Sequence, residues 1–278
     1  PGVFLNDTDR QIVELVIAFG WLSRFQIADY FGMTAVTVHR RAHKLASLGL
    51  LNDSARGVST EVLYTPTRKG MRLVGMAEFK IAVPSMQTMN HSEGLFAAAL
   101  RFGEAPLRHG ICISEKEIEA AVTTGRLSPR IQRLAPWAQF QYEGKMASWK
   151  PVAEAANGSG VGFKRPDLLL LKEGAAPTVV EFELNIKSTT KQYVRLLEAY
   201  NRAIKAGDFA NPILYVTAEV ASNRRAITTS LDAALRSANL LHKMTVSFLI
   251  LEIDTLHWNP RSAQNGYFKK VPRAPKAA

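Results

Sequence analysis

The chain has 278 residues, of which 47% are hydrophobic and 21% are charged, so it can form one large or two modest domains with buried cores. Its 35 Lys and Arg residues outnumber its 24 Asp and Glu residues, and the net charge of +11 favours a polyanionic partner such as nucleic acid. The chain lacks an apolar run of the ~20 residues that span a membrane and shows no secretory leader, so we expect a cytoplasmic protein without a membrane partner. Its single cysteine, Cys112, excludes a cysteine-based zinc site.

The first region, residues 1–80, carries three helical patterns separated by short breaks. Apolar residues recur at helical spacing over residues 8–19, after a run of capping residues. A second helix is predicted over residues 23–31, and Gly32 then marks a tight turn before a third helix over residues 35–48. Two short helices joined by a tight turn are typical of a helix-turn-helix, whose second helix enters the major groove of DNA.

The exposed face of the predicted third helix is polar and basic. Arg side chains can bond guanine edges with two hydrogen bonds, whereas Thr and Lys more often hold phosphates. The hairpin that follows this helix carries a further basic residue at its tip. The residues that we expect to contact DNA are Thr34, Thr37, His39, Arg40, Arg41, Lys44 and Arg56.

A hairpin is predicted directly after the third helix. Gly49 ends the helix, residues 56–60 form the hairpin tip, and residues 61–65 alternate as the return strand. A hairpin in this place is a wing, and the segments LGLL and YTPTRKG on either side of it resemble winged-helix regulators over about 70 residues. The resemblance implies binding of double-stranded DNA. A winged helix used only for protein contacts is the alternative, which the basic face of the third helix disfavours.

The second region, residues 90–256, follows a linker over residues 81–89 and precedes a basic tail over residues 257–278. Its strand and helix patterns alternate, which predicts an α/β fold. The strands are expected at residues 162–171, 178–184, 211–217 and 245–251, and the helices between them at residues 189–206 and 224–240.

Acidic residues mark two neighbouring strands of this region. Asp167 begins one strand, and Glu181 and Glu183 lie two residues apart on the next, so the two glutamates share a face. In a hairpin Asp167 could meet that pair, and like charges in one place need a cation. Oxygen ligands of this kind suit Mg²⁺ or Mn²⁺. Lys187 could add positive charge there, and the alternative is an exposed hairpin face on which neighbouring Lys and Arg residues pair with the acids.

These residues resemble the motif of the PD-(D/E)XK nuclease fold. In that fold a Pro-Asp strand and an acidic-X-Lys strand bind the metal that activates water for phosphodiester cleavage. The resemblance implies catalytic roles for Asp167, Glu181, Glu183 and Lys187, with Mg²⁺ or Mn²⁺ as cofactor. Glu183 stands at the position of the motif's lysine, and this departure favours a domain that has lost catalysis and needs no cofactor.

A wider resemblance spans most of the chain. A winged helix followed by RPDLLLL, VVEFELNIKS and YVRLLEAY is similar to the replication-relaxation family of plasmids and other mobile elements, whose members have been linked to plasmid relaxation or mobilisation. That resemblance implies a winged helix-turn-helix domain joined to an α/β PD-(D/E)XK nuclease-like domain.

Three further features of the second region carry alternative interpretations. Glu115 follows a strand at residues 110–113 and could join the predicted metal ligands Asp167, Glu181 and Glu183, or it could belong to a helix start capped by Ser114. His91 begins a helix and could lie near the acids or be structural. The basic run over residues 126–133 could follow DNA phosphates or form a solvated loop.

Two hypotheses for function follow. In the first, the winged helix selects a site on a plasmid or mobile element and the second domain nicks or cuts it with a divalent metal. In the second, the protein is a transcriptional regulator, and the nuclease-like domain serves dimerisation or extra DNA contact. Both require sequence-specific binding of double-stranded DNA, and a homodimer on a pseudo-palindromic site is a further expectation.

Overall fold

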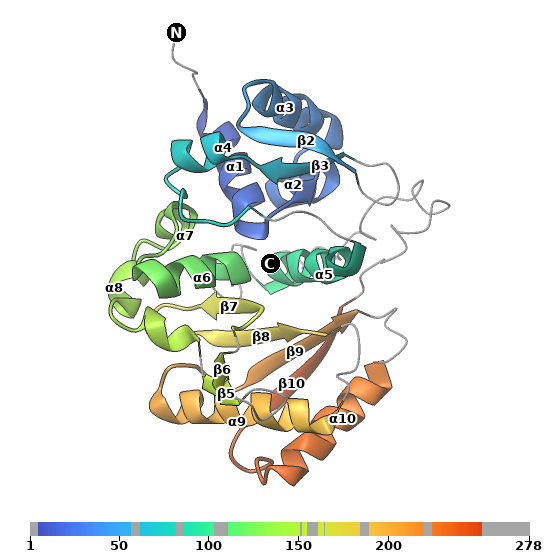
Figure 1. Cartoon of the computed structure of the whole chain (residues 1–278), viewed down its shortest axis with the longest axis vertical. Helices are drawn as coiled ribbons and strands as arrows, with labels where there is room; N and C mark the ends of the chain where they lie inside the picture. The colour runs from blue at the N-terminus through green and yellow to red at the C-terminus, as the bar shows by residue number, and fades with distance from the viewer. Residues whose placement is uncertain are drawn as a thin grey trace, which may run out of the picture.

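The computed structural model of the chain describes residues 5–56, 62–81, 86–102, 111–150, 152–154, 161–163, 165–183, 189–218 and 224–251. Over these residues the protein is a mixed α/β structure built around sheets of three and five strands. A smaller N-terminal unit stands above a larger unit, and helix α5 (Met86–Phe102) lies between them (Figure 1). None of the helices in these ranges is long and apolar enough to cross a membrane. The predicted basic tail, residues 257–278, lies outside the described residues.

The N-terminal unit contains the helices and strands predicted for the first region. Its three strands pair in the order β1-β3-β2 and are antiparallel. Its elements are α1 (Asp7–Phe19), β1 (Leu22–Ser23), α2 (Arg24–Phe31), α3 (Ala35–Ser47), β2 (Leu51–Arg56), β3 (Val62–Pro66) and α4 (Arg68–Leu73). The helices predicted at residues 8–19, 23–31 and 35–48 are therefore confirmed within one residue at each end.

Local sequence explains where these helices begin and end. Ser23 caps α2 through a reciprocal pair of hydrogen bonds with Gln26, and Thr34 caps α3 by accepting the amide of Thr37. Gly32 between the two helices has a φ of 63°, which a residue with a side chain rarely adopts. This glycine allows only three residues to separate the end of α2 from the start of α3.

The larger unit is built on a five-stranded mixed sheet in the order β10-β9-β8-β7-β4. Strand β7 pairs antiparallel with β4 and β8, whereas β8, β9 and β10 run parallel. The strands of this sheet are β4 (Ile111–Ser114), β7 (Leu168–Leu171), β8 (Thr178–Phe182), β9 (Ile213–Ala218) and β10 (Val246–Leu251). The other elements are α6 (Glu115–Thr124), α7 (Pro129–Leu134), α8 (Ala138–Tyr142), the 3₁₀ helix η1 (Met146–Trp149), β5 (Val152–Glu154), β6 (Val161–Phe163), α9 (Thr190–Ala206) and α10 (Arg224–Ser237).

Both faces of the five-stranded sheet are covered. Leu168 and Leu170 pack in one cluster with residues of α5, and Leu169 and Leu171 pack in another with residues of α9. Strand β7 is consequently apolar at every position, as expected for a strand that is buried on both faces. Figure 1 shows α5 on one side of the sheet and α9 with α10 on the other.

The strand predicted over residues 162–171 was wrong in its extent. The structure divides it into β6, which pairs with β5 in a separate two-stranded sheet, and β7, which begins only at Leu168. Pro166 between them has no amide hydrogen and cannot donate to a strand ladder. The hairpin predicted to follow is confirmed, since Leu168 pairs with Val180 across β7 and β8.

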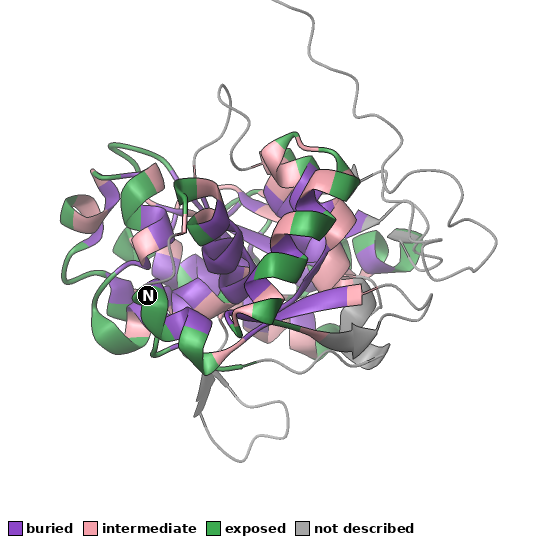
Figure 2. Ribbon diagram, turned by 90° about the horizontal axis from the view of Figure 1, so that it is seen from above, coloured by how far each residue is buried: buried purple, intermediate pink, exposed green. Residues whose placement is uncertain are grey.

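Helix α5 joins the two units through close packing on both of its sides. On one side the ring of Phe96 meets that of Phe19 from α1 edge to face, with centroids 4.9 Å apart. On the other side a Cβ atom at Gly94 would lie 1.9 Å from the ring of Phe182 on β8. The absence of a side chain at Gly94 therefore lets α5 approach the sheet. Figure 2, which looks down on the N-terminal unit, shows exposed residues on its outward surface and buried residues beneath them.

Candidate functional site

Helix α3 is set against the rest of the N-terminal unit by one apolar face. Val38, Ala42 and Leu45 on this face are completely buried. Because the helix has 3.6 residues per turn, the residues that point directly away from this face are those two positions before or after them. The exposed residues at these positions are Val36, Arg40, His43, Lys44 and Ser47. Because Lys44 reaches back to α1 through an ion pair with Asp9, the outward row is defined as Val36, Arg40, His43 and Ser47. This row is the surface of α3 that a ligand can reach first.

The two threonines predicted to contact DNA lie at the start of α3. The hydroxyl groups of Thr34 and Thr37 are 2.9 Å apart, and the Thr34 hydroxyl also accepts the amide of Thr37 at 3.2 Å. Both side chains remain accessible at the helix N-terminus, where unpaired backbone amides favour an anion such as phosphate. The threonines thus cap the helix and flank the outward row.

Two of the predicted DNA-contacting residues have a carboxylate partner inside the protein. Arg41 Nη1 lies 2.7 Å from Asp9 Oδ1, and Lys44 Nζ lies 3.3 Å from Asp9 Oδ2. Asp9 belongs to α1 and is buried, so both cations hold α3 against α1. Removing Asp9 would leave these two charges without that anchor. Arg41 and Lys44 flank the outward row and do not belong to it.

The opposite flank of α3 faces the wing strands. His39 Nδ1 lies 3.0 Å from the hydroxyl of Tyr64 on β3, and His43 Nδ1 lies 3.5 Å from Asp53 Oδ2 on β2. Arg56 is the last residue of β2, and its side chain lies outside the described residues, as does the hairpin tip that was predicted to follow it. Strands β2 and β3 therefore contact α3 on this flank.

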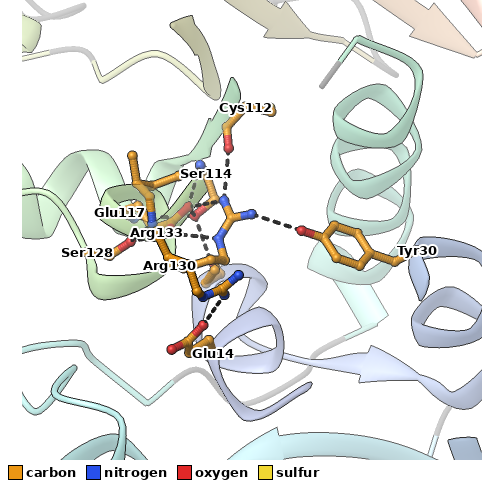
Figure 3. A network of polar contacts seen from close by, with 10 residues as sticks. Glu14, Tyr30, Cys112, Ser114, Glu117, Ser128, Arg130 and Arg133 are labelled. Atoms are coloured by element: carbon orange, nitrogen blue, oxygen red, sulfur yellow. Dashed lines mark hydrogen bonds and ion pairs between the residues drawn. The ribbon is translucent and has the colours of Figure 1, made fainter. Parts of the chain in front are cut away.

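A buried polar network fixes the N-terminal unit on the larger unit. Arg130 of α7 donates from Nε and Nη2 to the two carboxylate oxygens of Glu117 on α6, at 2.9 and 2.7 Å. The same guanidinium reaches the carbonyl of Cys112 at 2.8 Å and the hydroxyl of Tyr30 on α2 at 3.5 Å. Figure 3 shows Arg130 between Glu117 on one side and Tyr30 on the other. Arg130 thereby contacts both units.

Two further contacts cross the same junction. The Ser114 hydroxyl donates to the carbonyl of Ala18 on α1 at 2.6 Å, and Arg133 forms an ion pair with the buried Glu14 on α1. The prediction that residues 126–133 follow phosphates or form a solvated loop was wrong for Arg130, which is buried. Most of the run folds into α7, and from this helix the exposed Arg133 also reaches the N-terminal unit through its ion pair with Glu14.

The Glu117 carboxylate is kept charged by its partners. Burial by itself would raise its pKa, but the charge of Arg130 and hydrogen bonds from Arg130, Ser128 and Ser114 lower the pKa below its ordinary value. Sequence reasoning did not single out Glu117 as a site residue. The signal available was the Ser114-to-Glu117 spacing of a capping box, which the structure confirms and which predicts only a helix start.

The acidic residues predicted as metal ligands on the two strands lie before the start of β7 and at the end of β8. Asp167 is largely buried directly before β7, and its Oδ2 accepts the backbone amide of Phe182 at 2.9 Å. His91 of α5 comes close, with Nε2 3.7 Å from Asp167 Oδ2 and 3.2 Å from the carbonyl of Phe182. Asp167 thus ties the start of β7 to the end of β8. Two alternatives were open for His91, and the structure places its side chain near Asp167, but within α5 and not at the helix start that was predicted for it.

Glu181 lies inside the protein, on the face of β8 that packs against α9. It has no exposed surface, and the hydroxyl of Tyr200 on α9 donates to its Oε1. Its register partner on β9 is Tyr215, whose hydroxyl has no hydrogen-bond partner among the residues that the structure describes. Burial raises the pKa of Tyr200 and of Tyr215 well above the usual range, and the charge of Glu181 raises both further.

The remaining predicted ligands are placed differently. Glu183 follows β8, and its backbone amide donates to the carbonyl of Val216 at 2.9 Å. Glu115 begins α6, and its Oε1 lies 3.7 Å from Nη2 of Arg165. Nη1 of Arg165 also lies 2.9 Å from Oε2 of Glu119. Lys187 lies outside the described residues.

Asp167, Glu181 and Glu183 do not assemble a cation site among the described residues. Burial is the main cause that raises the pKa of Tyr215, and the charges of these three acids raise that pKa further. Within the described ranges, however, no group of three or more His, Cys, Asp or Glu side chains could hold a metal ion. Asp167 serves a backbone amide, Glu181 serves a buried tyrosine, and Glu115 serves Arg165. In this arrangement the contacts of these carboxylates are with protein groups, and we derive no metal-dependent step from them.

In comparisons with known proteins, no family model matches the chain, and no curated protein matches it.

Proposed function

We propose that this protein binds double-stranded DNA in a sequence-specific manner through a winged helix-turn-helix formed by its N-terminal unit. The observation that carries the proposal is the outward row of α3, which presents an exposed Arg40 and an accessible helix N-terminus away from the body of the protein. In this proposal α3 enters the major groove, and strands β2 and β3 form the wing beside it.

The setting of α3 supports this proposal. A helix that enters a groove must be held rigidly, and Asp9 holds α3 from α1 through Arg41 and Lys44. The net charge of +11 would draw the protein to DNA and make its affinity fall with rising salt. We expect two copies of the chain to bind a pseudo-palindromic site.

For the larger unit we propose a nuclease-like scaffold that acts in a regulator and does not cut DNA. Glu183 stands where the nuclease motif has lysine, and Asp167 and Glu181 have partners within the fold. A metal-dependent nickase or endonuclease is the second candidate. It is favoured by the position of Asp167, whose Oδ2 accepts the backbone amide of Phe182, the residue directly after Glu181. Under either candidate we propose that the protein acts on a plasmid or another mobile element, because its sequence is similar to the replication-relaxation family.

The DNA-binding proposal is tested by selecting duplexes from a randomised library with the full chain and measuring their affinity by fluorescence anisotropy. Arg40→Ala should weaken binding about 10- to 100-fold, because a side chain that bonds a base edge is lost. Arg236→Ala is the matched control, since this exposed arginine lies on α10 and pairs with Asp232. It should leave affinity within about twofold. Equal affinities for the Arg40→Ala variant and the unchanged protein would contradict the proposal.

Cleavage is tested on supercoiled plasmid that carries the selected site, with Mg²⁺, Mn²⁺ or EDTA. The regulator proposal predicts a mobility shift without nicking under all three conditions. Metal-dependent nicking that Asp167→Ala and Glu181→Ala both abolish would instead establish the second candidate. Both variants should first be shown to unfold at a denaturant concentration close to that of the unchanged protein, because both residues lie in the interior.

A further inference from the structure

An apolar side chain stands at the DNA-facing end of α3. Val36 occupies the first turn of the helix and is 80% exposed, whereas the other apolar residues of α3 face inward. An exposed valine forgoes the free energy that its burial would give. A ligand that covers the side chain of Val36 would recover part of that free energy. The side chain lies in the outward row, one helical turn before Arg40.

The surroundings of Val36 identify what could cover it. Among the exposed residues of α3 Val36 is the one apolar side chain, and Arg40 lies one helical turn from it, so the exposed apolar area of this helix is that of a single side chain within a polar face. A protein interface needs a larger apolar core, to which one valine is too small a contribution. The 5-methyl group of thymine is an isolated apolar group of matching size among polar base edges in the major groove.

We infer that Val36 contacts a thymine methyl group and makes the protein select thymine at that position of its site. This inference rests on the proposed DNA binding by α3. Val36 and Arg40 are one helical turn, ~5.4 Å, apart, and successive bases on a strand rise by ~3.4 Å. The selected thymine should therefore lie within about two base pairs of the base that Arg40 contacts, for which guanine is the expected partner.

The experiment removes the methyl group from the DNA and the side chain from the protein independently. The probe is the duplex enriched from the randomised library, with each thymine replaced in turn by deoxyuridine, which lacks the 5-methyl group. For the unchanged protein, one replacement should weaken binding about three- to tenfold. Val36→Ala should bind the thymine probe with that same loss and should not distinguish thymine from deoxyuridine at that position. Val36→Thr keeps a methyl group and should retain part of the preference.

The outcomes separate the inference from the proposal on which it rests. Because Val36 is exposed, its substitution should leave the thermal midpoint unchanged, so a loss of binding cannot come from unfolding. Enrichment of a site that depends on Arg40, with no deoxyuridine effect that Val36→Ala removes, would overturn the thymine contact alone. Failure to enrich any duplex would overturn DNA binding itself. A change in the oligomeric state of the DNA-free protein on Val36→Ala, measured by light scattering, would assign the side chain to a protein contact and overturn the inference.

Discussion

Glu117 and Glu181 are both fully buried carboxylates, but their surroundings give them different parts in the fold. Glu117 accepts two hydrogen bonds from the Arg130 guanidinium and lies at the junction between the two units. Glu181 accepts a hydrogen bond from the Tyr200 hydroxyl and lies between β8 and α9. Glu117 is a point of attachment for the N-terminal unit, whereas Glu181 sits in the core and belongs to the motif that resembles that of a nuclease.

The comparison shows that burial of an acid does not mark an active site. A buried charge needs a partner, and an arginine that joins two units satisfies that need as well as a metal ion does. Glu181 attracts attention because its neighbours in sequence match a motif. Glu117 has no such motif, yet it carries the clearer electrostatic role. Three predictions test this difference between the two carboxylates.

The largest effect is expected for the attachment point. Glu117→Ala should lower the free energy of unfolding by about 3–5 kcal/mol, because it leaves the charge of Arg130 buried without its partner. The measurement is urea unfolding followed by circular dichroism. Glu119→Ala on the same helix is the control, since its ion pairs with the exposed Lys80 and with the half-buried Arg165 should each contribute about 0–1 kcal/mol. Similar losses for the two variants would show that the buried pair has no special weight.

A smaller effect is expected around Glu181, where two tyrosines can be compared. Tyr200→Phe should destabilise the protein by about 1.5–3 kcal/mol, because a hydrogen bond to a carboxylate is lost. Tyr215→Phe is the matched variant on the neighbouring strand. Its hydroxyl finds no partner in the described part of the chain, so stability should stay the same or rise by about 1 kcal/mol. The same unfolding measurement compares them, and a larger loss for Tyr215→Phe would refute this assignment of partners.

The smallest effect concerns the pH dependence of stability. The pKa of Glu117 is lower in the folded protein than in the unfolded chain, where it is about 4.3. The unfolded chain therefore takes up the proton more readily, so the stabilisation is fully present above about pH 4.3 and is lost as the pH falls through the folded pKa. Between pH 5 and pH 3 the urea midpoint of Glu117→Gln should fall less than that of the unchanged protein. Parallel declines would mean that other groups control the acid limb.

The N-terminal helices illustrate what local sequence can predict. Their boundaries follow from Ser23, Thr34 and Gly32, whose capping and turn preferences act within a few residues. The hairpin of β7 and β8 was also predictable, because two apolar runs flank a turn. The extent of the strand before it was not, since Pro166 gives only a preference for where pairing stops.

The candidate site was predicted in part. Thr34, Thr37 and Arg40 lie where the helix pattern placed them, but Arg41 and Lys44 meet Asp9 from α1. Val36 was missed because an apolar residue in an amphipathic helix is ordinarily assigned to the core. Helical spacing from Val38 and Ala42 was the signal that places it on the outside.

Local sequence was enough to predict the helices of the N-terminal unit, the α/β character of the larger one, and the neighbouring positions of Asp167 and Glu181. These features depend on periodicity, capping and short connections, which act locally along the chain. Tertiary packing, in contrast, sets the contacts of Arg130 and Arg133 with the N-terminal unit and gives Asp167 and Glu181 their partners inside the fold. A charged side chain can be solvated or paired with equal ease as far as its neighbours in sequence are concerned. Its partner is chosen by elements such as α1 and α7 that meet in space only when the whole chain has folded.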